Sequence, residues 1–257
     1  MGKFSGYLIC TDLDGTFASK GEPVAENLEA VHYFVKNGGR FTVATGRMVE
    51  FIREKGLVSL INAPAILCNG SVIYDYSQEK ILRERRMGFS VREFLNCIKP
   101  VAHLVRLLYV YPDVATGCAC YDDLTRISHE HMDTNALKLL CKFETVEAAD
   151  AFQAYSREHP FLCNSYISKS WHFGVEFNAM DATKGHAVDF LKSYLGKIHT
   201  SVGVGNFDND LPLLQHADLK AAPANAKECI LEVADLVLVP CADGAIKDLI
   251  ERLEHRM

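Results

Sequence analysis

The sequence predicts an α/β fold in which a doubly wound parallel sheet is interrupted by an inserted α+β unit. Short apolar runs alternate with helical periodicities near both ends of the chain, which is typical of a parallel sheet covered by helices. Three of these runs end directly in polar residues, as strands do where they border a crevice at the edge of such a sheet. Between residues 84 and 178 strand-like runs are not regularly interleaved with helices, which favours an antiparallel sheet. We therefore predict a Rossmann-like core of residues 1–83 and 180–257 with an insert at residues 84–179.

The first part of the core is predicted to contain three buried strands, at residues 7–10, 41–44 and 65–68. Each is a short apolar run, and each is followed by polar residues or glycine. A helix is predicted at residues 24–36, because its apolar residues recur at helical spacing and Asn37-Gly38-Gly39 ends it.

The insert and the last part of the core are predicted in the same way. The insert has helical periodicity at residues 91–98 and 146–158 and strand-like runs at residues 104–110, 137–143 and 171–177. After residue 181 strands and helices alternate again. The predicted strands are residues 200–204, 219–222 and 236–239, and the predicted helices are residues 184–194, 210–216, 226–234 and 244–253.

The composition excludes several classes of protein. The 257 residues are 49% hydrophobic and 23% charged with a net charge of −6, an ordinary globular composition without the basic surface that binds nucleic acid. No stretch approaches the roughly 20 apolar residues of a membrane helix, and the first residues lack the apolar core of a signal peptide. We therefore expect a cytoplasmic protein with no nucleic-acid or membrane partner. Its partner is expected to be a small molecule and the protein a monomer or homodimer, neither of which follows from composition.

The nine cysteines form no Cys-x-x-Cys pair and are expected to be free thiols. One cluster, Cys118 and Cys120 followed by His129 and His131, leaves a zinc site open. The members of each pair are separated by one residue, which does not match the usual spacing of structural zinc ligands, although such residues share a face of a strand. The alternative is two buried small residues followed by an exposed loop.

Asp12 and Asp14 form the pattern with the most specific chemistry. They lie two positions apart just beyond a strand, where both can point into one crevice. Hydrolysis of a phosphate monoester uses two carboxylates in distinct roles: one attacks phosphorus, and the other protonates the leaving oxygen and then activates water. Gly15 and Thr16 leave the following turn open, so that backbone N–H groups can approach phosphate oxygens.

Four motifs follow one another along the chain: Asp12-Leu13-Asp14-Gly15-Thr16, Thr45-Gly46-Arg47, Lys184 and Gly205-Asn206-Phe207-Asp208-Asn209-Asp210. Together they resemble the haloacid-dehalogenase-like superfamily, in the form used by the Cof-like phosphatases with a type IIB cap. Asn69-Gly70 and Asn225-Ala226 match further positions of that subfamily. The resemblance covers the whole chain in the family's order, with an insert of cap size between the second and third motifs. The resemblance implies a magnesium-dependent phosphatase that hydrolyses small phosphorylated metabolites, sugar phosphates first, through an aspartyl-phosphate.

We assign the residues of these motifs to three roles. The catalytic residues are Asp12 as nucleophile, Asp14 as general acid/base, Thr45 and Lys184; those predicted to bind substrate or phosphate are Thr16, Gly46, Arg47, Asn69, Gly70 and Asn209; the Mg²⁺ ligands, by resemblance, are Asp12, the backbone carbonyl of Asp14, Asn206 and Asp210. Thr45 can donate its hydroxyl to a phosphoryl oxygen, and Lys184 places a positive charge at the start of a helix.

One position departs from the family pattern: residue 206 is Asn where the family has Asp. An amide oxygen can ligate a hard cation but adds no charge, so we expect weakened or retuned metal binding. This leaves open a catalytically weak or inactive phosphometabolite-binding protein of the same fold, and a phosphomutase shares the aspartyl-phosphate step. Arg47 either faces the phosphate or pairs with a carboxylate on a neighbouring loop, and the second role is favoured. Asn69 either touches substrate or closes a tight turn.

Overall fold

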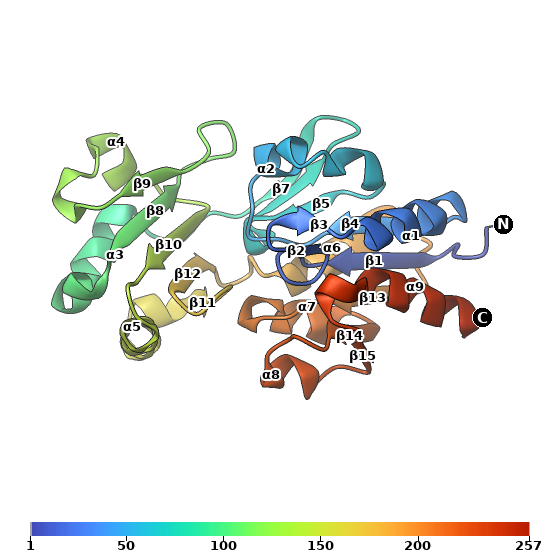
Figure 1. Ribbon diagram of the computed structural model, residues 1–257. Helices are drawn as coiled ribbons and strands as arrows, with labels where there is room; N and C mark the ends of the chain where they lie inside the picture. Colours follow the sequence, from blue (N-terminus) through green and yellow to red (C-terminus); the bar gives the residue numbers. More distant parts are fainter. Residues whose placement is uncertain (1, 257) are drawn as a thin grey trace. The chain divides into compact units, whose positions relative to one another are not determined.

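The computed structural model describes residues 2–256. The chain forms two compact units, the first made of Met1–Arg83 with Lys184–Met257 and the second of Glu84–Thr183. Each unit contains its own five-stranded sheet (Figure 1). No helix within residues 2–256 combines the length and the apolar character needed to cross a membrane.

The first unit is built on a parallel sheet, as the alternation of strands and helices predicts. In spatial order the strands are β15 (Leu236–Leu238), β14 (Leu219–Pro223), β13 (Thr200–Val204), β1 (Tyr7–Thr11) and β4 (Arg40–Val43). All four strand pairs are parallel, and Ile9 of β1 lies opposite both Val202 and Phe41. The predicted α/β fold with a parallel sheet is therefore confirmed, and β1 lies inside the sheet with its carboxyl end between two neighbours.

Helices cover this sheet in two packed pairs. Helix α1 (Ala25–Lys36) lies beside α9 (Ala245–His255), and α6 (Lys184–Leu195) packs against α7 (Leu211–His216) (Figure 1). Leu8 of β1 belongs to the hydrophobic cluster that includes residues of α6 and α7. Because strand residues alternate between the two faces, a sheet buried on both sides needs continuous apolar strands, which is what the sequence has. The unit's shorter elements are β2 (Ala18–Ser19), β3 (Glu22–Pro23), α2 (Val49–Glu54) and α8 (Glu228–Leu231).

The third predicted strand pairs differently from the first two. Strand β5 (Ala65–Leu67) contacts the parallel sheet through a bridge between Ala44 and Ile66, and pairs antiparallel with β6 (Val72–Asp75). Strand β7 (Lys80–Glu84) completes this three-stranded sheet. The second unit thus follows a β-hairpin rather than β5 itself. An apolar run predicts a strand but gives no information about the strand with which it pairs, so this three-stranded sheet was not predicted from the sequence.

The second unit is an antiparallel sheet packed against helices. In spatial order its strands are β11 (Ser165–Ser168), β12 (Gly174–Ala179), β10 (Lys138–Lys142), β8 (Leu107–Tyr111) and β9 (Ala119–Tyr121). Its helices are α3 (Val91–Ile98), α4 (His129–Met132) and α5 (Val146–Glu158). Phe94 of α3 and Phe152 of α5 both stack edge-on against Phe177 of β12, at ring-centre distances of 4.9 and 6.2 Å. These aromatic contacts fix the helical layer against one face of the sheet.

Three predicted elements have wrong boundaries. The strand predicted at residues 104–110 begins only at Leu107, because the preceding residues form the 3₁₀ turn Lys99–Leu104. The strand predicted at residues 171–177 begins at Gly174, whose missing Cβ leaves room for the Trp171 ring. The helix predicted at residues 226–234 shrinks to α8. In each case a turn interrupts an apolar pattern, and a turn is not visible in hydrophobic periodicity.

Candidate active site

The loop after β1 carries Asp12 and Asp14 away from the sheet in a tight turn. The Asp12 N–H donates to the Val204 carbonyl at 2.7 Å, which extends the β1–β13 pairing by one residue. The turn then closes when the Gly15 N–H donates to the Ala18 carbonyl at 2.8 Å. Gly15 has a φ of +86°, a left-handed conformation that favours glycine. The Thr16 N–H also donates within the turn, to the Leu13 carbonyl at 3.5 Å. The expectation that the N–H groups of Gly15 and Thr16 are open to phosphate oxygens is therefore wrong, because the turn uses both of them.

A buried lysine joins two of the predicted site residues. Lys184 Nζ lies 2.6 Å from Asp12 Oδ1 and 2.6 Å from Asp210 Oδ1. The Lys184 and Asp210 side chains are fully buried, and that of Asp12 is 9% exposed. The three residues come from the first turn of α6, the end of β1 and the loop after β13, and the Lys184–Asp12 contact alone joins positions 172 residues apart.

This cluster changes the acidity of its members. Burial, together with the nearby carboxylate of Asp210, raises the pKa of Asp12 to about 7, even though Lys184 opposes the shift. Burial alone would lower the pKa of Lys184, but the two carboxylates outweigh it and raise that pKa above its ordinary value. Lys184 is thus held as a cation, while one ammonium must serve two carboxylates.

Asp210 holds the loop of the fourth motif in shape. Its Oδ2 accepts hydrogen bonds from the backbone N–H groups of Asn206 at 2.9 Å and Phe207 at 3.1 Å. A Cβ at Gly205 would lie 2.3 Å from the Asp210 Cβ, so the loop can close over this carboxylate only with glycine there. Both oxygens of this predicted metal ligand thus accept hydrogen bonds within the protein: Oδ1 from Lys184 and Oδ2 from the loop.

Arg47 pairs with Asp14, the second carboxylate of the first motif. Its Nε lies 3.0 Å from Asp14 Oδ2 and its Nη2 lies 3.2 Å from Asp14 Oδ1, a two-bond pairing. The guanidinium also lies 4.3 Å from the ring centre of Phe51, and both charged side chains are nearly half exposed. Of the two roles left open for Arg47, the structure shows the pairing with a carboxylate, here the predicted general acid itself.

Thr45 and Asn69 follow neighbouring strands and are joined by one backbone hydrogen bond. The Asn69 N–H donates to the Thr45 carbonyl at 2.9 Å, and Thr45 Oγ1 accepts from the Arg47 N–H at 3.2 Å. Asn69 Oδ1 accepts from Asn209 Nδ2 at 3.2 Å, and both amides are buried. Asn69 has a φ of +60° and Gly70 a φ of +109°, so this segment is a tight turn. Gly46 lies between Thr45 and Arg47 in the same loop, whose positions are therefore tied to the fourth motif.

Asn206, a predicted metal ligand from the fourth motif, contacts the first motif. One end of its amide is 3.3 Å from the Asp14 carbonyl oxygen, 3.1 Å from Thr16 Oγ1 and 3.3 Å from Asp12 Oδ2. Neighbouring ligands of an octahedral Mg²⁺ at 2.0–2.1 Å are about 3.0 Å apart, so an amide oxygen at this end would lie near ligand spacing from the Asp14 carbonyl and the Asp12 carboxylate, both of which are oxygen ligands of the kind Mg²⁺ prefers. Asp12, the Asp14 carbonyl and Asn206 therefore fit the metal that the resemblance implies.

Asn225 supports the site in a way that the motif pattern did not predict. Its Nδ2 donates to the Gly15 carbonyl at 2.9 Å and its Oδ1 accepts from the Cys241 N–H at 2.7 Å. The Asn-Ala match singled out this position, but it gave no information about the partner. The link between Asp210 and Lys184 was missed for the same reason: both residues were recognised, and their contact depends on three-dimensional packing.

The possible zinc site is not assembled. Within residues 2–256 no group of three or more His, Cys, Asp or Glu side chains is placed to hold a metal ion. Cys118 and Cys120 are exposed rather than buried, and the ring of His131 is hydrogen-bonded to the Tyr121 hydroxyl. The predicted free state of all nine cysteines holds, since each is a free thiol.

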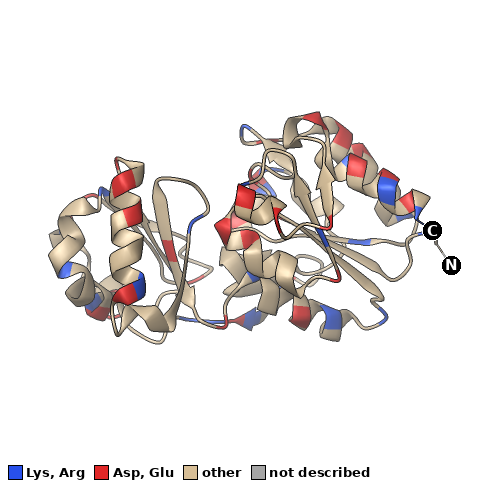
Figure 2. Ribbon diagram, turned by 90° about the horizontal axis from the view of Figure 1, so that it is seen from below, with Lys and Arg blue, Asp and Glu red and all other residues tan. Residues whose placement is uncertain are grey.

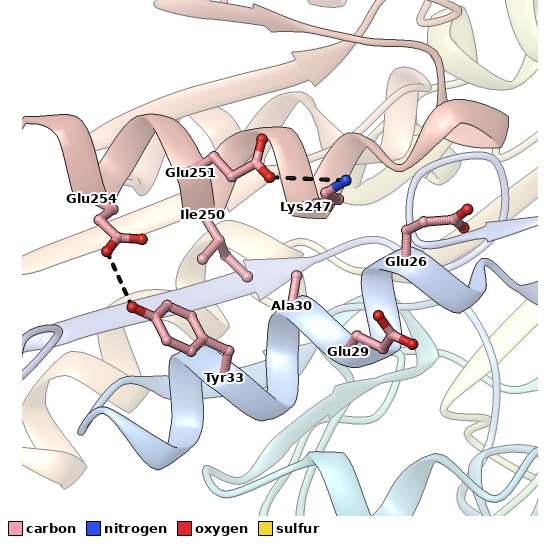
Figure 3. Close-up of a pocket in the computed structure, with 8 residues that line it drawn as sticks. All are labelled: Glu26, Glu29, Ala30, Tyr33, Lys247, Ile250, Glu251 and Glu254. Atoms are coloured by element: carbon pink, nitrogen blue, oxygen red, sulfur yellow. Dashed lines mark hydrogen bonds and ion pairs between the residues drawn. The ribbon is translucent and has the colours of Figure 1, made fainter.

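A separate pocket of about 300 Å³ lies between α1 and α9 (Figure 3). Its lining includes Glu26, Glu29, Glu251 and Glu254, with Lys247 among them. Four carboxylates would repel a phosphate dianion, so this pocket is unsuited to the predicted substrate. Elsewhere, Lys and Arg are interspersed with Asp and Glu in both units (Figure 2), so the informative charge arrangement is the local one around Asp12.

The fold and the site define an α/β enzyme with a buried carboxylate–lysine centre at the carboxyl edge of a parallel sheet. The chain belongs to the haloacid dehalogenase-like hydrolases, whose family model matches residues 9–250. Its relatives support a phosphatase, and the match confirms the superfamily resemblance drawn from the motifs.

Comparisons with individual proteins agree with this assignment. A Mycoplasma pneumoniae protein inferred to be a phosphatase is 39% identical over 255 residues, covering 88% of this chain and 89% of its own. The pyridoxal phosphate phosphatase YbhA of Escherichia coli is 22% identical over 255 residues, covering 90% of this chain and 92% of its own. Among solved structures, a haloacid dehalogenase-like hydrolase from B. subtilis superposes with a TM-score of 0.80 at 19% identity, over 96% of this chain and 99% of its own. The subclass IIB sugar phosphatase BT4131 gives 0.76 at 17% identity, over 96% and 98% of the two chains.

Proposed function

We propose that this phosphatase is a Mg²⁺-dependent phosphoric monoester hydrolase that acts on small phosphorylated metabolites, sugar phosphates first, through a phosphorylated Asp12. The observation that carries the proposal is the contact of Lys184 Nζ with Asp12 Oδ1 at 2.6 Å. A nucleophilic carboxylate held beside a permanent cation is suited to attack a phosphoryl group, because the cation offsets the negative charge that gathers on phosphorus.

The chain's own residues supply each step of the proposed reaction. Asp12 attacks phosphorus and forms the aspartyl-phosphate, while Asp14 gives its proton to the departing oxygen. Asp14 then takes a proton from water, which attacks phosphorus and returns Asp12 to its free form. To do this the Asp14 side chain must leave Arg47, to which it is bonded in the present conformation.

Two further groups support this reaction. Lys184 keeps the Asp12 carboxylate oriented throughout, and the Thr45 hydroxyl is available to a phosphoryl oxygen. Asp12, the Asp14 carbonyl and Asn206 would hold Mg²⁺, which when bound neutralises part of the phosphate charge.

The proposal is tested with a generic aryl phosphate. We expect hydrolysis with added Mg²⁺, loss of it in EDTA, and at least about a 10³-fold loss of kcat in Asp12→Asn, because this change removes the nucleophile and little volume. Asn62→Asp, at an amide that is outside these motifs and hydrogen-bonded to the backbone of Gly39 and Phe41, is the matched control and should retain activity. Hydrolysis that persists in Asp12→Asn or in EDTA would contradict the proposal. A panel of phosphorylated sugars and other small phosphates then ranks substrates.

A further inference from the structure

The Asn206 amide is surrounded by oxygen atoms on one side. The end that faces the first motif has three neighbours within 3.3 Å: the Asp14 carbonyl, the Asp12 carboxylate and the Thr16 hydroxyl. The first can only accept hydrogen bonds, and so can the second when ionised. Hydrogen bonding therefore assigns this end to the amide nitrogen in the metal-free protein, where Nδ2 donates to these oxygens.

The rest of Asn206 is fixed. Its N–H donates to Asp210 Oδ2 at 2.9 Å, and its carbonyl accepts from the Lys227 N–H at 3.0 Å. The amide lies against Gly15, where an added Cβ would be 2.5 Å from it. Held in this way, the side chain can exchange its nitrogen and oxygen by a half-turn of the amide, which leaves its shape almost unchanged.

We infer that in the metal-free protein the Asn206 NH₂ group donates hydrogen bonds to the oxygens that would ligate Mg²⁺, and that the amide rotates by a half-turn when Mg²⁺ binds. This rests on the metal site of the proposed function. In the metal-free state Nδ2 donates to the oxygens that would ligate the cation. In the loaded state the same end of the amide must be Oδ1, since a cation requires an oxygen ligand. Metal binding therefore has to break the hydrogen bonds of Nδ2.

Thr16 can serve both states. A hydroxyl accepts a hydrogen bond from Nδ2 in one orientation of the amide and donates to Oδ1 in the other, and its Oγ1 is 3.1 Å from that end in either case. An aspartate at position 206 could not do this, because an ionised carboxylate has no donor. It would place another negative oxygen against Asp12 and the Asp14 carbonyl until a cation arrived.

The direct test follows the side-chain NH₂ group of Asn206 by NMR in ¹⁵N-labelled protein. Its signals are assigned by their absence from Asn206→Asp and, as a second variant, Asn206→Ala. In metal-free protein at pH 7.5 we expect NH₂ protons that exchange slowly with water, because they are hydrogen-bonded. Saturating Mg²⁺ should shift these signals and speed the exchange. An exchange rate in metal-free protein equal to that of exposed side-chain amides overturns the inference, and so do signals that Mg²⁺ leaves unchanged.

A stability measurement tests the same idea without activity. We expect metal-free Asn206→Asp to unfold at a lower temperature than the native protein, and to gain more in Tm from Mg²⁺, with Mg²⁺ bound at least about tenfold more tightly. The control Asn62→Asp makes the same chemical change at an amide that bonds to the Gly39 carbonyl and the Phe41 N–H. Its Tm gain from Mg²⁺ should equal the native one. Equal metal-free Tm values and equal gains for Asn206→Asp and the native protein overturn the inference.

Failure of the inference and failure of the proposed function give different results. If hydrolysis needs Mg²⁺ and Asp12 but the Asn206 signals do not change with Mg²⁺, the inferred rotation of the amide is contradicted and the proposed phosphatase mechanism is not. A slowly exchanging Asn206 amide that responds to Mg²⁺, in a protein whose hydrolysis persists without Asp12, does the reverse.

Discussion

Both units bury a lysine against a carboxylate, but in different kinds of place. In the second unit Lys138 and Glu176 lie on the adjacent strands β10 and β12, both 2% exposed, with Nζ 3.1 Å from Oε1. The Lys138 ammonium also lies 4.4 Å from the ring centre of Tyr111. In the first unit Lys184 contacts two carboxylates that come from the end of a strand and from a loop.

The two sites differ in how the backbone positions the charged side chains and in whether the buried charges balance. A pair on adjacent strands is positioned by the hydrogen-bond ladder, and its ion pair satisfies two charges that the sheet has buried. The Lys184 cluster sits where strands end, and there one ammonium serves Asp12 and Asp210. Burial and the second carboxylate, that of Asp210, raise the pKa of Asp12. A buried cation with a surplus of carboxylates at a sheet edge therefore indicates chemistry, whereas the strand pair indicates structure.

The largest expected effect separates the two lysines by activity. We expect Lys184→Met to lower kcat for an aryl phosphate by at least about 10³-fold, because it removes the cation beside the nucleophile. Lys138→Met should keep kcat per folded molecule within a few-fold. Steady-state kinetics on protein whose folded fraction is known by circular dichroism makes the comparison. Lys192→Met, at a partly exposed lysine of the same helix α6 that pairs with Asp218, is the control for Lys184. Similar losses in both buried variants would break the distinction.

The second prediction concerns the stability of the strand pair. Lys138→Met should cost about 3–5 kcal/mol in the free energy of unfolding, because it leaves the Glu176 charge buried without its ammonium. The double variant Lys138→Met, Glu176→Leu should recover most of this loss, since a buried ion pair can be replaced by apolar side chains at little cost. Urea denaturation of the native protein and the two variants measures both values. A double variant no more stable than the single one would show that the pair does more than satisfy its own charges.

The sequence was informative where chemistry is local and uninformative where contacts are distant. Asp12, Lys184 and Asp210 were all identified from motifs, and the parallel sheet followed from apolar runs. The contact of Lys184 with Asp210 and the support of Gly15 by Asn225 could not be predicted, because they join segments whose relative placement only the fold determines.

The same limit applies to the elements. Helices α3 and α5 match their predicted residues, and each begins after a Ser or Thr whose side chain accepts a hydrogen bond from the helix. By contrast, α8 is shorter than predicted, and the pairing of β5 was missed. The capping residues at the start of a helix can be recognised in the local sequence. Strand partners and interrupting turns depend on the rest of the chain.

The third prediction uses the raised pKa of Asp12. A proton on this carboxyl competes with the metal, so Mg²⁺ affinity should be constant above pH 7 and fall about tenfold per pH unit below it. Because its pKa is raised to about 7, the Asp12 carboxyl is mostly protonated at pH 6, where an ordinary aspartate is ionised, so Mg²⁺ affinity decreases as the pH is lowered. Calorimetric titration with Mg²⁺ at pH 6, 7 and 8 measures it, with Asp12→Asn as the control that should lose this dependence. Equal affinities at pH 6 and pH 8 would contradict the prediction.

The smallest expected effect concerns the exposed pair of Arg47 and Asp14. Arg47→Leu should change the free energy of unfolding by less than about 1 kcal/mol, because both side chains are nearly half exposed and solvent screens them. Activity should fall by no more than about tenfold, since Asp14 has to leave Arg47 in order to transfer a proton. Arg47→Lys should resemble Arg47→Leu, because an ammonium cannot make the two parallel hydrogen bonds of a guanidinium. Kinetics and thermal unfolding of both variants, beside Arg85→Leu as an exposed arginine paired with Asp181 in the other unit, give the comparison. A loss as large as that of Lys184→Met would place Arg47 among the groups that act on the phosphate, and the contrast between buried and exposed charges in this site would fail.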